Sequence, residues 1–591
     1  MKKLFVYLKD YKKESVLGPL FKLLEATFEL IVPLVMAAII DTGVASADRS
    51  YVMKMCMVLV LLAAIGLTCS ITAQYFAAKA AVGFATGLRH ALFQHIQKLS
   101  FSEMDRVGTS TLITRMTSDV NQVQNGVNLV LRLFLRSPFI VFGAMIMAFT
   151  IDVKAALIFV VTIPLLSVVV FGVMLISIPL YKKVQAALDK VLGITRENLT
   201  GSRVIRAFHK EEDEIRIFGE NNELLTKAQL YVGKISALMN PLTYIIINGA
   251  IVALVWTGAI RVDSGYITQG AVVALINYMS QILVELVKLA NLIININKSL
   301  ACGNRIRSIL EMEPSITKHG GIMTSAQASE NGQPDGSATS AVEFSHVGLT
   351  YAGAGEEALT DVHFTAMPGE TIGIIGGTGS GKSSVVNLIP RFYDATAGCV
   401  KVNGKNVKDY SIEELREKIG VVPQKAVLFA GTIRENLKWG NEAATDEEMM
   451  EALIIAQAKE FVEAKEEGLS YEIEQGGRNL SGGQRQRLTI ARALVKKPEI
   501  LILDDSASAL DFATDAKLRG AIRDMTEEMT VFIVSQRASS IRHADKIIVL
   551  DDGEVAAIGN HESLLANCEV YQEIYYSQFQ KPTGEEGQNL I

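Results

Sequence analysis

Cysteine is scarce in this chain of 591 residues, which contains five cysteines and no C-x-x-C pair. The five are scattered, at Cys56, Cys69, Cys302, Cys399 and Cys568. A disulfide framework or a zinc site needs cysteines, or cysteines and histidines, in closely spaced sets. The sequence therefore suggests neither kind of site.

An excess of basic residues is also absent. Lys and Arg total 57 against 63 Asp and Glu, which gives a net charge of −6, and the isoelectric point is near 5.9. Proteins that bind nucleic acid usually carry a basic patch or an overall basic charge. The charge balance therefore argues against a nucleic-acid partner.

The N-terminus does not have the pattern of a removed signal peptide. It reads MKKLFVYLKDYKK, and no short apolar stretch with a small-residue cleavage site follows it. It combines basic residues with apolar ones, as a helix lying in the membrane interface does. We therefore expect an amphipathic interfacial helix here.

Long apolar runs, in contrast, are abundant. The chain is 49% hydrophobic with a mean hydropathy of +0.27, and the excess lies within residues 16–300. A helix needs about 20 apolar residues to cross the ~30 Å hydrocarbon core of a bilayer. Six runs meet this length: 16–40, 53–78, 129–150, 155–180, 241–261 and 270–296. In the third run, Arg132 and Arg136 indicate that the part inside the membrane starts later.

The connections between these runs alternate between short and long. The two long ones, 79–128 and 181–240, are polar and helical in pattern. An even number of crossings places both termini on one side, and the basic N-terminus makes that side cytoplasmic. We therefore expect the long connections to extend into the cytoplasm, where their turns near 101–110 and 206–215 can contact the second half of the chain.

The sixth run carries four polar residues close to one helical face, Asn277, Tyr278, Gln281 and Glu285. Polar groups within a membrane are unfavourable unless they face a water-filled pathway or a neighbouring helix. These residues can therefore line a substrate pathway or form hydrogen bonds between helices. The sequence leaves both interpretations open.

Residues 314–341 are rich in Gly, Ser, Thr and Ala and poor in large apolar residues, which predicts a flexible linker. The linker divides the chain into a transmembrane domain, 1–313, and a second domain, 342–577. A polar C-terminal tail, 578–591, follows the second domain.

The second domain contains a phosphate-binding loop, GGTGSGKS, at residues 376–383. It fits the pattern G-x-x-x-x-G-K-[ST], with a strand-like run before it and a helix-like run after it. That context argues against a chance glycine-rich turn. The expected nucleotide-binding residues of the loop are Gly376, Gly377, Thr378, Gly379, Ser380, Gly381, Lys382, Ser383 and Ser384.

The chemistry of the loop points to ATP with Mg²⁺. Glycines let backbone N–H groups surround phosphates, Lys382 supplies a full positive charge, and the Ser383 hydroxyl can bind Mg²⁺. Asp504, at the end of the strand-like LILDD, and Gln424, after VVP, are the other expected metal ligands. Tyr351 is placed to stack on adenine.

Together with the segment NLSGGQRQRLTIARAL, these motifs resemble those of the ATP-binding cassette family. The order of segments resembles a bacterial ABC exporter half-transporter. The resemblance implies six transmembrane helices with long cytoplasmic extensions, an all-α membrane domain, followed by an α/β P-loop NTPase cassette. It also implies ATP-driven export of amphipathic drugs, lipids or peptides across the plasma membrane, with both termini and the cassette in the cytoplasm.

The family pattern pairs two cassettes head to tail, so that each ATP lies between the phosphate loop of one chain and the signature of the other. The resemblance assigns the signature to Leu480, Ser481, Gly482, Gly483 and Gln484. It assigns the following D-loop to Ser508, Ala509, Leu510 and Asp511.

Three positions depart from this pattern. Asp505 replaces the glutamate that polarises the attacking water, and its side chain is one methylene shorter. Gln536 replaces the histidine of the switch loop, and a Gln can donate a hydrogen bond but carries no charge. Gln475 replaces an acidic residue before the signature.

These departures favour a heterodimer. The chain's own site, with Asp505, Gln536 and Gln424 as its catalytic residues, would bind ATP but hydrolyse it slowly. Its signature would complete the competent site of a second, non-identical half-transporter that has the usual Glu and His. Two alternatives remain, a homodimeric exporter with slow hydrolysis and an ATP-sensing regulatory membrane protein. The expected partners are the second subunit, the lipid bilayer and a small amphipathic substrate.

Overall fold

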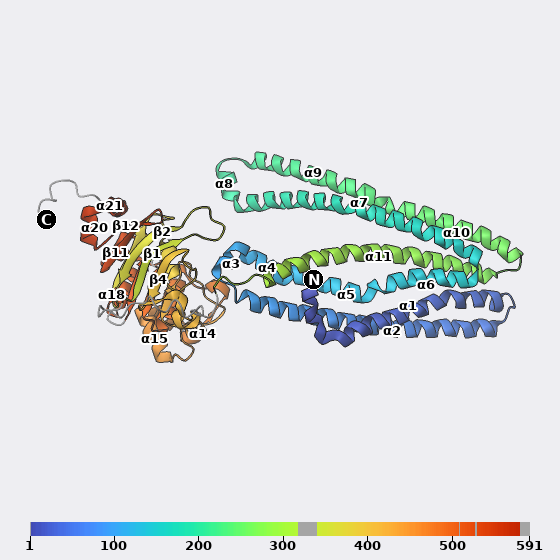
Figure 1. The fold of residues 1–591 in the computed structure, drawn as a ribbon, viewed down its shortest axis with the longest axis horizontal. Helices are drawn as coiled ribbons and strands as arrows, with labels where there is room; N and C mark the ends of the chain where they lie inside the picture. The colour runs from blue at the N-terminus through green and yellow to red at the C-terminus, as the bar shows by residue number, and fades with distance from the viewer. Residues whose placement is uncertain (1, 317–339, 507–508, 526–528, 580–591) are drawn as a thin grey trace, which may run out of the picture. The chain divides into compact units, whose positions relative to one another are not determined.

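The computed structural model describes residues 2–316, 340–506, 509–525 and 529–579. The chain divides into two compact units (Figure 1). The first unit contains residues 1–97 and 110–312, and the second contains residues 98–109 together with the chain from 313 onward. The predicted linker lies mostly outside the described residues, as does most of the predicted tail.

The first unit is helical. Within the described residues it holds six helical stretches that are long and apolar enough to cross a membrane, which confirms the predicted number. The stretches are longer than the apolar runs because the polar connections continue the same helices. They are Leu4–Val44, Arg49–Ile96, Thr109–Ile151, Val153–Thr200, Glu211–Asp263 and Gln269–Leu310.

These stretches are built from α-helices with short π-helical segments between some of them. The helices are α1 (Lys12–Ala38), α2 (Arg49–Ile96), α4 (Thr109–Thr114), α5 (Val120–Leu129), α6 (Arg136–Ile151), α7 (Val153–Thr200), α8 (Ser202–Ala207), α9 (Glu211–Ala237), α10 (Met239–Asp263) and α11 (Gln269–Leu310). The π segments are η2 (Ile39–Val44), η3 (Arg115–Asp119) and η4 (Val130–Phe134). The last one ends just before α6, which begins at Arg136, and where the membrane part of this third stretch starts remains a prediction.

Small residues bring the first two membrane helices close together. Gly18 of α1 lies against the backbone of Ala73 and Ala77 of α2, where an added methyl group would already be in contact. Helices in a membrane associate largely through such close backbone packing. In the same unit, α11 packs against α1, α5 and α6, and α7 runs beside α9 and α10 (Figure 1).

The expected N-terminal helix is present as a 3₁₀ helix, η1, over Lys2–Tyr11. Leu4 is buried, whereas Phe5 and Val6 are about half exposed. The ring of Tyr11 fills the space beside Gly83 of α2, because a methyl group at that glycine would overlap it. The helix is thus fixed to α2, and its position at the membrane interface remains a prediction.

The second unit is an α/β domain with a six-stranded sheet in the order β12-β11-β3-β10-β9-β6. All strands except β12 run parallel to their neighbours. The strands are β3 (Thr371–Gly376), β6 (Ile419–Val422), β9 (Ile500–Asp504), β10 (Thr530–Val534), β11 (Lys546–Asp551) and β12 (Glu554–Gly559). Parallel strands end at the same edge of a sheet, and ligands of such folds bind at their carboxyl ends.

An antiparallel sheet, in the order β2-β1-β4-β5, packs on the same core. Its strands are β1 (Val342–Leu349), β2 (Leu359–Ala366), β4 (Ala397–Val402) and β5 (Lys405–Asn406). A short antiparallel pair of β7 (Gly431–Thr432) and β8 (Glu472–Ile473) belongs to a second, mainly helical core. The helices of this unit are α12 (Lys382–Leu388), α13 (Ile412–Glu417), α14 (Ile433–Lys438), α15 (Asp446–Ile455), α16 (Lys459–Glu463), α17 (Gly482–Val495), α18 (Phe512–Arg523), α19 (Ala538–Ile541), α20 (His561–Asn567) and α21 (Glu569–Tyr576).

One turn of the first long connection belongs to this second unit. It forms α3, over Phe101–Val107, which starts with a capping box of Ser100 and Glu103. The Phe101 ring lies 4.8 Å from the Phe392 ring, and the Tyr393 hydroxyl donates a hydrogen bond to Asp105 Oδ2 at 2.5 Å. The predicted contact of this turn with the nucleotide half is confirmed, whereas a contact by the second turn, at α8, stays a prediction.

The start of β4 requires a glycine. Gly398 has a φ of +68°, and a Cβ there would lie 2.0 Å from the carbonyl oxygen of His346. We expect Gly398→Ala to destabilise the second unit by about 1–3 kcal/mol, because both the backbone conformation and the contact are unfavourable. Scanning calorimetry of the full chain in detergent should show the unfolding transition of this unit lowered by several degrees. Gly355→Ala is the control, since no atom lies within 4 Å of its Cβ position.

Candidate functional site

The phosphate loop occupies the expected position between a strand and a helix. Strand β3 carries a buried apolar run through Ile375 to Gly376, and α12 begins at Lys382. Gly379 and Gly381 both have a φ of +89°, which other residues rarely adopt. A Cβ on Gly376 would lie 2.2 Å from the carbonyl oxygen of Leu550. The glycines of the motif are therefore needed for this backbone.

The ammonium group of Lys382 lies inside the loop. Its Nζ donates hydrogen bonds to the carbonyl oxygens of Gly376, at 2.9 Å, and Gly377. The residue is only 8% exposed, and this burial lowers the pKa of Lys382, although the charges of Asp505 and Asp504 act in the opposite direction. A phosphate bound in the loop would supply the counter-charge that the buried ammonium group favours.

The expected metal ligands lie together at the ends of the parallel strands. The Ser383 hydroxyl donates a hydrogen bond to Asp504 Oδ1 at 3.0 Å, and Gln424 lines the same cavity. Burial raises the pKa of Asp504, which a bound cation would counteract. A hydroxyl, a carboxylate and an amide oxygen are ligands that Mg²⁺ prefers. The residues present therefore fit a Mg²⁺ ion.

One cavity of about 330 Å³ collects most of the predicted ATP-binding residues. The Tyr351 hydroxyl, at its edge, lies 2.9 Å from Ser384 Oγ, and the Tyr351 ring meets the Tyr393 ring edge to face at 5.1 Å. The predicted residues that line this cavity are Tyr351, Thr378, Gly379, Gly381, Lys382, Ser383, Ser384, Gln424, Asp504, Asp505 and Gln536.

The two catalytic residues that differ from the family pattern, Asp505 and Gln536, both line this cavity. Asp505 follows β9 in a left-handed conformation, with a φ of +44°, and its amide donates a hydrogen bond to the carbonyl oxygen of Val534 at 2.9 Å. Its Oδ2 accepts a hydrogen bond from Gln424 Nε2 at 3.3 Å. Gln536 follows β10, the strand that pairs with β9, and lines the same cavity. The two replaced groups are thus parts of one site.

The signature starts a helix elsewhere in the same unit. Ser481 caps α17, where its hydroxyl accepts from the Gln484 amide at 3.2 Å and the Gln484 side chain accepts from the Ser481 amide at 3.0 Å. Leu480 is buried, and the Cβ position of Gly482 meets only open space. Among the described residues, none of 480–484 lines the cavity at the phosphate loop.

The D-loop residues support the signature helix. The carbonyl oxygen of Ala509 lies against Gly483, Leu510 is buried, and Asp511 caps α18 by accepting from the Thr514 amide at 2.9 Å. Ser508 lies outside the described residues. Gln475 lies in the 3₁₀ turn η7 (Gln475–Gly477) that precedes the signature.

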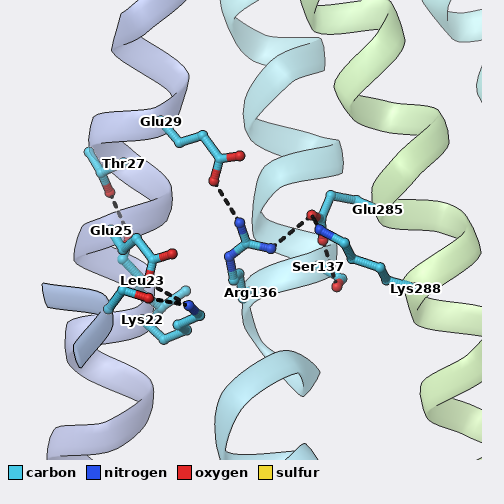
Figure 2. Close-up of polar contacts among 10 residues, drawn as sticks. Lys22, Leu23, Glu25, Thr27, Glu29, Arg136, Ser137, Glu285 and Lys288 are labelled. Carbon is cyan, nitrogen blue, oxygen red and sulfur yellow. Dashed lines mark hydrogen bonds and ion pairs between the residues drawn. The ribbon is translucent and has the colours of Figure 1, made fainter. Parts of the chain in front are cut away.

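In the first unit, the predicted polar residue Glu285 is part of a buried ionic cluster (Figure 2). Its carboxylate accepts hydrogen bonds at 2.8 Å from Arg136, Ser137 and Lys288, and Arg136 also binds Glu29 at 2.6 Å. Glu285 is 3% exposed, whereas the Glu29 side chain is 40% exposed. We call these five residues the Arg136 cluster; it joins α1, α6 and α11.

A cavity of about 460 Å³ lies beside this cluster. Asn277, Gln281 and Glu285 line it, and whether this cavity is a substrate pathway remains a prediction. Tyr278 does not line it, because its hydroxyl donates to the Leu30 carbonyl at 2.6 Å and its side chain is fully buried. The other lining residues are Glu29, Val32, Pro33, Met36, Ser280, Val284 and Lys288.

The sequence did not identify the side chains that contact the predicted residues in these two sites. Glu29 and Ser137 carry no pattern that marks them, and Arg136 served only to locate the start of a helix. Tyr393 carried one usable signal, since it is an aromatic residue shortly after the phosphate-loop helix. Its contact with Asp105, far earlier in the chain, follows no local pattern.

The Arg136 cluster yields a stability prediction. Arg136→Leu leaves the buried Glu285 with a smaller set of partners, so we expect the membrane unit to lose about 3 kcal/mol. Thermal unfolding of the full chain in detergent measures this loss. Arg216→Leu, which removes an exposed ion pair with Glu220, should change stability by less than about 1 kcal/mol. Equal effects of the two changes would contradict the stabilising role, and Arg136→Leu combined with Glu285→Leu should recover part of the loss.

Comparison with known proteins accounts for both units. Residues 15–286 match the family model of the ABC transporter transmembrane region, and residues 359–508 match that of the ABC transporter. An ABC transporter ATP-binding protein of Mycobacterium tuberculosis is 36% identical over 97% of both chains. An ATP-dependent lipid A-core flippase of Syntrophus aciditrophicus is 31% identical over 84% of this chain and 81% of its own.

The fold also has a close match among solved structures. A bacterial Atm1-family ABC exporter with ATP bound superposes with a TM-score of 0.76, over 97% of this chain and 99% of the other, at 22% identity. In the part of the chain that the structure describes, six apolar helices precede one α/β cassette with an intact phosphate loop. The chain therefore belongs to the ABC transporter family, as a half-transporter of the exporter type that spans the plasma membrane and carries one cytoplasmic, ATP-hydrolysing cassette.

Proposed function

We propose that this chain is one of two non-identical subunits of an exporter that moves amphipathic compounds out of the cytoplasm by alternating access. Its own ATP site binds nucleotide and hydrolyses it slowly. The observation that carries this proposal is the shared cavity of an intact phosphate loop with Asp505 and Gln536. The phosphate-loop lysine, the metal-binding carboxylate and Tyr351 all line this cavity, and the two altered groups belong to hydrolysis.

The altered groups weaken the same transition state. A base must reach the proton of the attacking water, and a displacement of about 1 Å can lower the rate on the order of 10²-fold. Asp505 is shorter than a glutamate, and its carboxylate already contacts Gln424. Gln536 offers no positive charge to the phosphate on which negative charge develops. Slow hydrolysis follows from both.

The signature supports the second part of the proposal. Ser481 and Gly482 are exposed at the start of α17, apart from the cavity of their own chain. A helix N-terminus with an exposed serine and glycine suits an anion. A second cassette would place its phosphate there, and its own Glu and His would hydrolyse the ATP.

Coupling of the ATP site to the membrane helices is supported by a chain of side-chain contacts. Asp105 of α3 accepts a hydrogen bond from Tyr393, the Tyr393 ring contacts the Tyr351 ring, and Tyr351 binds Ser384 of the phosphate-loop helix. A nucleotide stacked on Tyr351 would thereby affect α3, which lies between two membrane helices in the sequence. Alternating access then results because ATP binds the inward-facing and the outward-facing state of the exporter with different affinities.

The substrate class follows from the cavity between α1 and α11. It combines apolar side chains, such as Val32 and Met36, with charged ones, such as Glu29 and Lys288. The Oε1 atom of Gln281 is buried there without a hydrogen-bond partner among the residues that the structure describes. An amphipathic molecule would satisfy both kinds of surface. The lipid A-core flippase relative, and a Bacillus subtilis relative provisionally named as a multidrug exporter, agree with this class.

Two other functions remain consistent with the altered site, a homodimeric exporter that hydrolyses ATP slowly and a membrane protein that senses ATP. Purification together with the product of a neighbouring transporter gene, followed by a screen of drugs, lipids and peptides for stimulated ATPase activity, separates them. Brisk ATPase by the chain alone favours the homodimer. ATP binding without turnover, even with the partner present, favours sensing.

The division of roles predicts unequal effects of two substitutions. In the two-chain complex, Asp505→Asn should lower the ATPase rate less than 2-fold, because this site contributes little turnover. Ser481→Arg should lower it more than about 10²-fold, since it blocks the site that hydrolyses. Steady-state ATPase assays in lipid nanodiscs measure both. Similar losses from the two substitutions would contradict the proposal.

The coupling path predicts a separation of binding from turnover. Tyr393→Phe keeps the ring contact with Tyr351 but removes the hydrogen bond to Asp105. We expect substrate-stimulated ATPase to fall about 5-fold, the effect of roughly one net hydrogen bond, with ATP affinity changed less than 2-fold.

Tyr410→Phe is the matched control for that substitution. Its hydroxyl also donates one hydrogen bond, here to the backbone carbonyl of Val402 at 2.9 Å, and α3 is not involved. If substrate-stimulated ATPase falls in both variants, or in neither, Tyr393 is not part of the coupling path.

A further inference from the structure

The C-terminal helix lies next to the loop that carries Gln536. Strand β10 ends at Val534, and the residues Ser535, Gln536 and Arg537, which we call the switch loop, lead into α19 at Ala538. Helix α21 ends at Tyr576, and the chain continues through Ser577 to Gln578. The side chain of Gln578 then reaches the switch loop.

Gln578 binds the switch loop with both ends of its amide group. Its Nε2 donates to the carbonyl oxygen of Gln536 at 2.7 Å, and its Oε1 accepts from the backbone amide of Ala538 at 2.9 Å. Only one orientation of the amide satisfies a carbonyl and an N–H group together. The two hydrogen bonds enclose Arg537 and fix the backbone on both sides of it.

Helix α21, which ends two residues before Gln578, is firmly held. Tyr571 of α21 is fully buried in a cluster with Ile375, Ala538 and Ile541, and its hydroxyl contacts His561 Nδ1 at 2.8 Å. Ile375 is the residue before Gly376 of the phosphate loop. The C-terminal helix therefore packs against the strand that leads into the phosphate loop and also holds the switch loop.

The rest of the switch loop is tied to its own strands. The Ser535 amide donates to the Ile374 carbonyl at 3.1 Å, within the sheet, and the Arg537 amide donates to Ser535 Oγ at 3.0 Å. The hydrogen bond from Gln578 also fixes the peptide unit of Gln536 itself, a residue that lines the ATP cavity.

We propose that Gln578 is a positioning residue that holds the Gln536 side chain where it meets the terminal phosphate of ATP. The neutral Gln536 has one interaction to offer this phosphate, a hydrogen bond, and a hydrogen bond depends strongly on distance and angle. Fixing the peptide of Gln536 preserves that geometry. The inference rests on the part of the proposed function in which this cavity binds ATP, whether or not the site hydrolyses it.

The test compares two nucleotides that differ at the terminal phosphate. In the full chain, reconstituted in lipid nanodiscs, the affinities for ADP and for a non-hydrolysable imido analogue of ATP are measured by equilibrium binding. Gln578→Ala should lower the preference for the ATP analogue over ADP about 5-fold, the value of roughly one hydrogen bond, and should change ADP affinity less than 2-fold. Gln578→Glu, which keeps the acceptor and loses the donor, should give a similar loss.

Two controls separate positioning from a general structural effect. Gln572, on the same helix, donates to the Leu565 carbonyl at 2.9 Å and does not contact the switch loop in the described structure, so Gln572→Ala should leave the preference unchanged. In a Gln536→Ala background, Gln578→Ala should have no further effect, because residues that act through one another are non-additive.

Four results would overturn the inference. Three are an unchanged preference in Gln578→Ala, an equal change in Gln572→Ala, and a further loss in the Gln536→Ala background. The fourth is loss of binding of both nucleotides in Gln578→Ala, since that result indicates a structural role. Failure of the unsubstituted chain to bind either nucleotide would instead contradict the proposed function.

Discussion

The parallel pairing of β3, β6, β9 and β10 is the constraint on which the ATP site depends. Val534 of β10 pairs with Ile374 on one side and with Asp504 on the other, and β6 pairs with β9 on its far side. Since these strands end at one edge, the phosphate loop, the metal-binding carboxylate, Gln424 and Gln536 all emerge beside one another. A shift of one residue in any pair would move a whole strand's side chains to the other face and would separate groups that have to act together.

Local patterns were sufficient to predict the framework. The six apolar helices, the strand–loop–helix around Lys382 and the signature at 480–484 are each encoded within about 20 consecutive residues. The site residues on these elements were predicted as well, because a motif such as GGTGSGKS fixes its own backbone. For the same reason the membrane face with Asn277 and Gln281 could be read from spacing along a single helix.

The partners of these residues could not be predicted, because they come from distant parts of the chain. Arg136 and Glu285 are 149 positions apart, and Asp105 and Tyr393 are 288 apart. Gln578 stands at the start of what the sequence indicates is a polar tail, yet its amide binds the switch loop, because the aromatic residues of α21 anchor the helix before it. Hydropathy and helical period indicate which face of a helix or strand is buried. They do not indicate which side chain from a distant part of the chain packs against that face.

The unequal burial within the Arg136 cluster has a mechanical consequence. Arg136 binds Glu285 of α11 in a fully enclosed contact, whereas its bond to Glu29 of α1 is open to solvent on the carboxylate side. Water can replace an exposed partner far more readily than a buried one. If the helices part around the cavity, the separation should therefore begin along the seam between α1 and α6, while α6 and α11 travel as a single body.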